Sequence, residues 1–214
     1  MSLATRIQRV LPGDSSLENS DRTIDLLRKG GIIVYPTDTF YALGANAYEG
    51  AAVEKVYSLK ARDRGKPLSI VVADLAMAIS VAFDPPPAFA RLAAAFWPGP
   101  LSLIVRARPG FPPSLLGPGG TIAMRAPALA WLRAFLAQAG FPLTATSANP
   151  AGGREIDEAD EALRFFDGRV DLLIDGGRTP GGAPSTIVDL TGTAPRLLRE
   201  GAVPREKLAI TLSE

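Results

Sequence analysis

The sequence predicts an α/β (α+β) fold in which strands of mixed direction form one sheet with flanking helices. Short apolar runs rich in β-branched residues alternate irregularly with segments of helical spacing, and 19 prolines and 21 glycines are spread through the turns. A hydrophobic fraction of 47% with 21% charged residues is typical of a globular chain with a buried core. For this length we expect a single domain spanning residues 1–214.

Helices are predicted where apolar residues recur every three or four positions between a capping residue and a glycine or proline. The first begins with Ser20-Asp21, which can cap it, and ends at Gly30. A later helix has Asp74 as its cap, and another begins at Asp157. In chain order, the predicted helices cover residues 20–29, 51–59, 74–80, 87–97 and 129–139, followed by the helix from residue 157.

Strands are predicted at short runs of β-branched and other apolar residues that a proline, glycine or polar residue closes. The first such run ends at Pro36. The predicted strands cover residues 32–35, 67–72, 101–106, 121–124, 143–146, 172–174, 185–190 and 196–198. Turns rich in proline and glycine, at 109–113 and 117–120, separate two of them. Helices and strands thus alternate without a repeating unit, which favours a mixed sheet.

The chain contains no cysteine and no histidine, and its formal net charge is +1 with a pI of about 8.0. This excludes thiolate and Ser-His-Asp catalysis, disulfides, and most zinc and transition-metal sites. The charge gives no global signal for nucleic acid, so a nucleotide or RNA site must be a local patch. No apolar run reaches the roughly 20 residues that span a bilayer, and no signal peptide is found, so we expect a cytoplasmic protein with no membrane partner.

Three polar clusters follow apolar runs and carry most of the groups available for chemistry. In the first, Thr37, Asp38 and Thr39 come directly after Pro36, and ligands often bind where strands end. The alternative is a Pro-Thr-Asp turn whose side chains bond their own backbone.

The second cluster is basic and collects Lys60, Arg62, Arg64 and Lys66 in one short segment. Such a group can neutralise phosphates, with arginine as a bidentate fork and lysine as a point charge. The alternative is a set of solvated surface cations, one of them paired with Asp63. No P-loop or dinucleotide glycine motif accompanies the cluster, so any nucleotide must be held in another way.

The third cluster is neutral and places Ser147 and Asn149 after a predicted strand, where they offer hydrogen-bond donors and acceptors. A Ser/Asn turn is the alternative. Arg125, Ser185 and Arg199 are further candidates at strand edges, although a lone arginine is more often a surface salt-bridge residue.

Taken in order, four motifs closely resemble those of the YrdC-like threonylcarbamoyl-AMP synthases. They are Pro36-Thr37-Asp38-Thr39-Phe40-Tyr41-Ala42-Leu43, Lys60-Ala61-Arg62 through Lys66-Pro67-Leu68, Thr146-Ser147-Ala148-Asn149, and Pro184-Ser185-Thr186-Ile187-Val188-Asp189. The match runs from about residue 24 to residue 201. Ala42 departs from the family, which commonly has glycine at that place, and its methyl group could crowd the backbone near threonine. Because the chain ends soon after residue 201, it is similar to the short form of the family, without an extra C-terminal domain.

The resemblance implies a twisted mixed sheet around a positively lined cavity. It also implies a nucleotidyltransferase reaction that joins L-threonine, bicarbonate (or carbon dioxide) and ATP into L-threonylcarbamoyladenylate and pyrophosphate, with magnesium accompanying ATP. The product would pass to a threonylcarbamoyl-transferase complex that modifies the adenosine beside the anticodon of tRNA. No histidine base is needed, because the amine can attack carbon dioxide unaided and the protein supplies alignment and charge neutralisation.

The resemblance also assigns residues to this reaction, none of them to a metal. The implied catalytic residues are Lys60, Arg62, Ser147 and Asn149. The implied ATP contacts are these four together with Thr146, Ser185 and Arg199. The implied threonine-binding residues are Thr37, Thr39, Lys66 and Arg125, with Lys66 or Arg125 as the partner of the threonine carboxylate.

Two other functions are compatible with the same residues. The family's concave basic surface suits double-stranded RNA or tRNA, which a binding module without catalysis would hold through shape and phosphate contacts. Related domains in hydrogenase maturation transfer carbamoyl groups within much longer chains, and the lack of zinc-finger cysteines argues against that role. Threonine-dependent consumption of ATP would distinguish the synthase from both.

Overall fold

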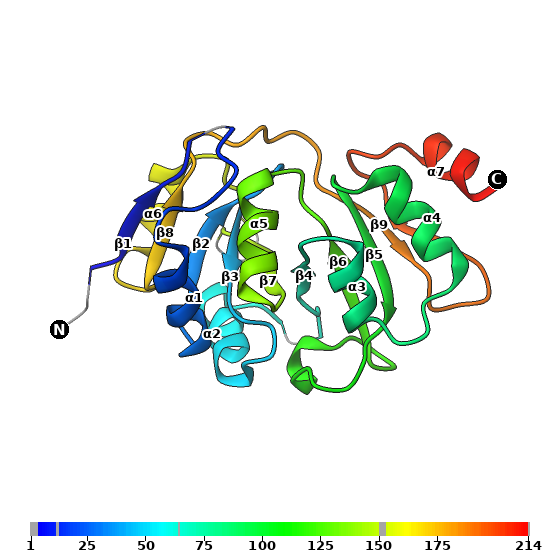
Figure 1. The fold of residues 1–214 in the computed structure, drawn as a ribbon, viewed down its shortest axis with the longest axis horizontal. Helices are drawn as coiled ribbons and strands as arrows, with labels where there is room; N and C mark the ends of the chain where they lie inside the picture. The colour runs from blue at the N-terminus through cyan, green and yellow to red at the C-terminus, as the bar shows by residue number, and fades with distance from the viewer. Residues whose placement is uncertain (1–3, 12, 64, 150–152, 214) are drawn as a thin grey trace.

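The computed structural model describes residues 4–11, 13–63, 65–149 and 153–213, and its ten strands form one sheet (Figure 1). In spatial order the strands run β1-β8-β2-β3-β7-β4-β6-β5-β9-β10. Their bounds are β1 Arg6–Arg9, β2 Ile33–Pro36, β3 Tyr41–Gly44, β4 Ser69–Val71, β5 Leu101–Arg106, β6 Thr121–Arg125, β7 Leu143–Ser147, β8 Leu172–Asp175, β9 Thr186–Asp189 and β10 Arg196–Arg199. The predicted basic residue Arg64 and the turn residues 150–152 lie outside the described residues.

Strand direction is mixed, as the sequence predicts. β1 and β2 run parallel to β8, β4 runs parallel to β6, and β5 runs parallel to β9. The pairs β2–β3, β3–β7, β4–β7, β5–β6 and β9–β10 are antiparallel. β1 and β10 form the two edges, so the described ends of the chain lie at opposite ends of the sheet (Figure 1).

Helices bury the apolar stripes that their sequences predict, in two clusters on the sheet. Their bounds are α1 Ser20–Arg28, α2 Gly50–Lys60, α3 Leu75–Val81, α4 Pro87–Phe96, α5 Ala130–Ala139, α6 Ala159–Phe166 and α7 Arg205–Ser213, with a 3-10 turn at Pro113–Leu115. α1 and α5 contribute Leu27 and Phe135 to the smaller cluster. The other helices contribute to the larger cluster, with Phe89 of α4 among its buried residues. Asp74 caps α3 by accepting a hydrogen bond from the backbone N–H of Met77, as predicted.

Three elements were not predicted from the sequence, namely β1, β3 and α7. β3 contains alanine and glycine, which have low strand propensity, but it pairs with β2 on one side and β7 on the other. β1 is largely exposed and carries two arginines, and α7 buries only part of its surface, so neither has a strong apolar pattern. Long-range pairing and packing therefore form these elements against weak local signals.

Several predicted boundaries were also wrong. α6 begins at Ala159 rather than at Asp157, because Asp157 and Glu158 instead bind Arg178 across the neighbouring loop. α4 ends at Phe96, one residue before the prediction, since the residue preceding a proline favours extended backbone. The strands predicted over 67–72 and 185–190 are confined to Ser69–Val71 and Thr186–Asp189.

Candidate functional site

Between β7 and β9, one face of the sheet lines a cavity and carries several small or polar side chains, whereas the opposite face is buried and largely apolar. Residues two apart on a strand share a face, and residues paired in register share it across strands. Ser69 is paired with both Ala123 and Ala145, and Ile104 is paired with Ala123. These residues form the floor of a cavity of about 600 Å³. The residues between them on each strand, Ile70, Leu103 and Met124, are fully buried in the large core cluster.

The first predicted cluster forms one end of this cavity. The Thr37 hydroxyl donates to the carbonyl oxygen of Phe40 at 2.8 Å and accepts from the backbone N–H of Thr39 at 3.2 Å. The turn interpretation is therefore right for Thr37, because its side chain bonds its own backbone. Thr37 and Thr39 nevertheless line the cavity, and both are buried.

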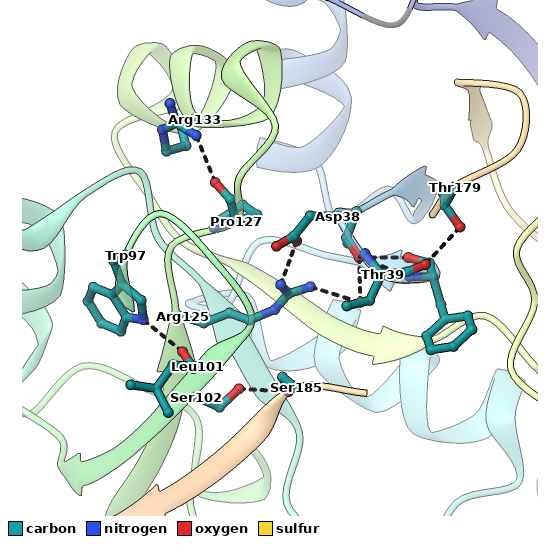
Figure 2. A network of polar contacts seen from close by, with 12 residues as sticks. Asp38, Thr39, Trp97, Leu101, Ser102, Arg125, Pro127, Arg133, Thr179 and Ser185 are labelled. Atoms are coloured by element: carbon teal, nitrogen blue, oxygen red, sulfur yellow. Dashed lines mark hydrogen bonds and ion pairs between the residues drawn. The ribbon is translucent and has the colours of Figure 1, made fainter. Parts of the chain in front are cut away.

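Arg125 reaches this end of the cavity from the last position of β6. Its Nη1 donates to Asp38 Oδ1 at 2.5 Å, and its Nη2 donates to Thr39 Oγ1 at 3.4 Å (Figure 2). Both partners of the ion pair are nearly enclosed, with 9% of each side chain exposed. Arg125 lines the cavity, so it belongs with the first cluster rather than with the exposed surface.

Lys60 lies on the buried stripe of α2, one helical turn after Val56 and Tyr57, which explains why a lysine is enclosed there. Its ammonium group donates to the carbonyl oxygen of Ser147 at 2.5 Å and to Asn149 Oδ1 at 2.7 Å. The Ser147 hydroxyl donates to the same Asn149 oxygen at 2.6 Å. The structure thus joins the second and third predicted clusters. Ser147 and its neighbour Thr146 line the cavity, with Lys60 held behind them.

The environment of Lys60 changes its proton affinity. Burial, to which the positive charge of Arg62 adds, lowers the pKa of Lys60 to about 8. The negative charge of Glu155 opposes this lowering and acts in the same direction on Arg199. Glu155 therefore lies within electrostatic range of Lys60, which is held behind the lining, and of Arg199, which is part of it.

Arg62 lines the cavity beside Pro67, and neutral groups hold its guanidinium. Nε donates to the carbonyl oxygen of Lys66 at 2.9 Å and Nη2 to that of Pro67 at 3.1 Å. The Lys66 side chain is exposed and does not line the cavity. Of the two residues predicted to hold a carboxylate, the structure brings Arg125 to the cavity and leaves Lys66 outside.

Ser185 and Arg199, two candidates at strand edges, form a second end of the cavity. Arg199 donates from Nε and Nη2 to the carbonyl oxygen of Ser185 at 3.1 and 2.8 Å. The Ser185 hydroxyl lies 3.0 Å from the Ser102 hydroxyl, a contact that Figure 2 shows. A Cβ at Gly201 would collide with the carbonyl oxygen of Pro184, so only glycine allows this close approach. Burial lowers the pKa of Arg199 below its ordinary value.

Several cavity residues with charged or hydroxyl side chains were not singled out from the sequence, among them Ser102, Glu155, Asp189 and Arg196. Burial alone would raise the pKa of Asp189, but hydrogen bonds from Thr191 and Arg196 outweigh it and hold the pKa below its ordinary value. The alternation of Leu101-Ser102-Leu103 was a usable signal for a polar strand face. Glu155 has no comparable signal, because it lies in a loop.

The fold and the site define an α/β protein with a largely cationic cavity suited to a small polyanion, because four arginines and two carboxylates line it among the described residues. The family model described as Telomere recombination matches residues 25–201. The chain belongs to this family, the Sua5/YciO/YrdC proteins, which confirms the resemblance seen in the motifs.

Two curated relatives carry related names. The threonylcarbamoyl-AMP synthase of Pyrococcus abyssi is 35% identical over 188 residues, covering 88% of this chain and 55% of the relative. The putative threonylcarbamoyl-AMP synthase of Mycobacterium tuberculosis is 34% identical over 189 residues, covering 88% of this chain and 87% of the relative. The chain therefore spans about half the length of the first relative.

A solved structure has the same fold. The crystal structure of Pyrococcus abyssi Sua5 complexed with L-threonine superposes with a TM-score of 0.90 at 32% identity, covering 98% of this chain and 62% of that one. In the ranges that the structure describes, no helix is long and apolar enough to cross a membrane. The same ranges contain no group of three or more histidine, cysteine or acidic side chains placed to hold a metal ion.

Proposed function

We propose that this protein is a threonylcarbamoyl-AMP synthase, a nucleotidyltransferase that converts L-threonine, bicarbonate and ATP into L-threonylcarbamoyladenylate and pyrophosphate. The observation that carries the proposal is that three separate groups meet at one cavity. They are the Thr39–Arg125 end, Ser147 with Lys60 held behind it, and the Ser185–Arg199 end. The names of the curated relatives and the threonine complex of Pyrococcus abyssi Sua5 support the choice of substrate.

The chemistry suits a chain without histidine. Bicarbonate yields carbon dioxide and water by taking up a proton, and the threonine amine adds to the carbon dioxide and releases a proton as the carbamate forms. A carbamate oxygen then attacks the α-phosphorus of ATP. A bond forms between this oxygen and phosphorus while the bond from phosphorus to the β-phosphate bridging oxygen breaks, and pyrophosphate leaves with the electron pair. The protein must align two reactants and neutralise the charge on the leaving group, which fixed cations and neutral donors can do.

Lys60, Arg62, Ser147 and Asn149 are the residues we assign to the phosphates. Burial lowers the pKa of Lys60 to about 8, so most of the ammonium groups remain protonated at pH 7. Two backbone carbonyls, rather than a carboxylate, accept the hydrogen bonds of Arg62, so no partner in these contacts offsets its charge. We assign Thr146, Ser185 and Arg199 to the remainder of the nucleotide, since all three line the cavity.

Thr37, Thr39 and Arg125 are assigned to L-threonine. Arg125 is the better candidate for its carboxylate, because Lys66 is exposed and lies outside the cavity. A guanidinium can bind a carboxylate with two parallel hydrogen bonds, which fixes the orientation of the amino acid as well as its position.

Magnesium is expected to accompany ATP, and the oxygen donors of the cavity fit it. Mg²⁺ in such sites is bound by one or two carboxylates together with substrate phosphates and water. Glu155 and Asp189 are the acidic residues that line the cavity among those described. Asp189 already accepts hydrogen bonds from Thr191 and Arg196. Glu155, near Lys60 and Arg199, is therefore our candidate for the protein contact to an ion that would neutralise phosphate charge.

The labile product implies a partner that consumes it, which we propose is a threonylcarbamoyl-transferase complex acting on tRNA in the cytoplasm. Direct binding of double-stranded RNA or tRNA by this chain is the alternative function. The names of the relatives favour the synthase. RNA binding without catalysis would be steeply salt-dependent and would consume no ATP.

The deciding experiment measures pyrophosphate release from ATP by the purified protein, with mass detection of the adenylate. We expect release only when L-threonine and bicarbonate are both present. Release without threonine would contradict the proposed substrate. Absence of release, together with salt-sensitive binding of double-stranded RNA, would replace the synthase with the binding module.

A further inference from the structure

We propose that Asp38 is a positioning residue that fixes the Arg125 guanidinium for the carboxylate of the amino-acid substrate. The inference rests on the proposed function and deepens it, because it adds a residue that acts through Arg125 without lining the cavity itself. Three observations carry it: the one-sided contact between the two side chains, their burial, and an unpaired carboxylate oxygen.

The contact between Asp38 and Arg125 uses one carboxylate oxygen and joins residues at or just beyond the ends of separate strands of the sheet. Asp38 lies in the turn between β2 and β3, and Arg125 is the last residue of β6, 87 positions along the chain. Nη1 of Arg125 donates to Oδ1 of Asp38 at 2.5 Å, and Nη2 is directed at Thr39 (Figure 2). A guanidinium has five N–H donors, so these two bonds leave donors for a second carboxylate.

The two side chains differ in their access to the cavity. Arg125 and Thr39 line it, whereas Asp38 does not, although only 9% of each partner in the ion pair is exposed. Asp38 is thus placed behind the guanidinium relative to the cavity. A substrate carboxylate would approach Arg125 from the open side while Asp38 holds the opposite side, which limits rotation of the guanidinium about its long side chain.

The second carboxylate oxygen argues against a purely stabilising role. Oδ2 of Asp38 is buried and has no hydrogen-bond partner among the described residues. Buried polar atoms without partners are rare and destabilising, and buried ion pairs are poor stabilisers compared with apolar packing. A bidentate contact, which would use both oxygens, is the stronger arrangement of an arginine–carboxylate pair, and this pair does not adopt it. The contact through Oδ1 instead sets a direction for the guanidinium.

The first test is Asp38→Asn, which keeps the shape of the side chain and removes its charge. We expect the KM for L-threonine to rise about tenfold or more, as when a charge-assisted hydrogen bond is lost, and the KM for ATP to change less than about twofold. Glu161→Gln is the matched control. Its carboxylate also lies 2.5 Å from an arginine, Arg154, but that arginine side chain is 70% exposed and the pair lies outside the cavity lining. We expect this variant to leave both KM values unchanged.

A purely structural contact gives a different result. If Asp38 only fastens the turn to β6, Asp38→Asn lowers the melting temperature and raises both KM values together or neither, and this outcome overturns the proposal. A selective change in the threonine KM is an effect that loss of stability does not produce.

A double variant keeps the test decisive if Asp38→Asn folds poorly. Asp38→Asn combined with Arg125→Gln contains no unpaired buried charge at this position. If Asp38 acts through Arg125, the double variant binds L-threonine no more weakly than Arg125→Gln alone, because neighbouring residues in one contact are not additive. A further loss of tenfold or more would show that Asp38 acts independently and would overturn the proposal.

The proposed function can fail separately. Calorimetric titration of L-threonine into wild-type protein and each variant measures carboxylate binding without catalysis. Wild-type protein that binds threonine but releases no pyrophosphate would contradict the synthase while leaving the role of Asp38 measurable. Wild-type protein that makes the adenylate, with Asp38→Asn unchanged in its threonine KM, would retain the synthase and reject the positioning residue.

Discussion

Arg125 and Arg199 line the same cavity, but groups of different charge hold them. A carboxylate holds Arg125, with both side chains 9% exposed. The carbonyl and hydroxyl oxygens of Ser185 hold Arg199. The pair around Arg125 is electrically neutral as a whole, whereas the contact around Arg199 retains a full positive charge. The first arrangement favours orientation of a singly charged group, and the second favours neutralisation of an added negative charge.

Lys60 and Arg62 belong with Arg199 in this comparison. The oxygens of Ser147 and Asn149 hold Lys60, and two backbone carbonyls hold Arg62, so neither contact cancels the cation. Among the described residues, three cations on the phosphate side have no ion-pair partner, and one cation on the amino-acid side has one. This division matches a triphosphate and a carboxylate, respectively. Variants that remove a charge should therefore separate into two groups by which substrate they affect.

The largest effect is expected for Lys60→Ala. The variant loses charge-assisted hydrogen bonds of about 1.5 to 3 kcal/mol, which is roughly a ten- to hundredfold decrease in kcat/KM, while the fold is retained. Steady-state pyrophosphate release and far-UV circular dichroism measure the two quantities. Lys55→Ala on the exposed side of the same helix is the matched control. Wild-type turnover by Lys60→Ala would contradict the assignment of the phosphate side.

A smaller effect is expected for Arg199→Ala, because this arginine is more exposed than Lys60. The KM for ATP should rise by roughly three- to tenfold, in the range of one partly solvated charged hydrogen bond, with little change in the KM for threonine. Arg178→Ala is the control, since carboxylates hold that arginine outside the cavity lining. An increase confined to the KM for threonine would contradict the assignment of the Arg199 end to ATP.

The sequence was sufficient to predict the mixed sheet and most helices, because strand ends and helix caps leave local signals. Most of the residues that it singled out also line the cavity. It could not show which clusters meet. Lys60 contacts residues 87 and 89 positions away, and no local pattern specifies that contact. The choice between Lys66 and Arg125 likewise depends on tertiary structure, because both follow a strand or turn signal and only one side chain faces the cavity.

The strand β3, which the sequence did not predict, likewise depends on long-range pairing. Tyr41–Gly44 has weak strand propensity, but it brings the Thr37–Thr39 turn beside Ser147 through its pairing with β7. Glu155 was missed for a related reason, since its place in the cavity depends on a loop whose path the strand pattern does not determine.

The pH dependence of ATP binding offers a third test, with an effect of a few fold. Burial lowers the pKa of Lys60 to about 8, so the KM for ATP should rise as the pH passes from 7 to 9 and the ammonium loses its proton. Lys60→Arg should remove this dependence, because arginine stays charged. Titration of Lys60 does not itself unfold the protein over this range. Because its pKa is lowered in the folded state, the unfolded chain binds more protons than the folded chain between pH 8 and 10.5. The contribution of Lys60 to the free energy of unfolding therefore increases as the pH rises. A flat wild-type profile would show that Lys60 does not titrate in this range.

The smallest effect is expected for Ala42→Gly, which probes the boundary between the two ends of the cavity. Ala42 lines the cavity and is paired in register with Ser147, so its methyl group lies between the threonine side and the phosphate side. Glycine in a strand should lower the free energy of unfolding by about 0.5 to 1 kcal/mol, with changes in either KM below about threefold. Thermal melts and steady-state kinetics measure both quantities.

The control for Ala42→Gly is Ala45→Gly, which removes a buried methyl group just beyond the same strand and outside the cavity lining. If only the Ala42 variant binds threonine more tightly, its methyl group crowds the amino-acid side. If Ala42→Gly instead improves ATP binding, the methyl group of Ala42 belongs to the phosphate side. The boundary between the two sides of the cavity then lies closer to Thr39 and Arg125 than the hydrogen bonds indicate. Equal behaviour of the two variants would mean that the methyl group serves packing alone, and that the division of the cavity depends on the charges of Lys60, Arg125 and Arg199.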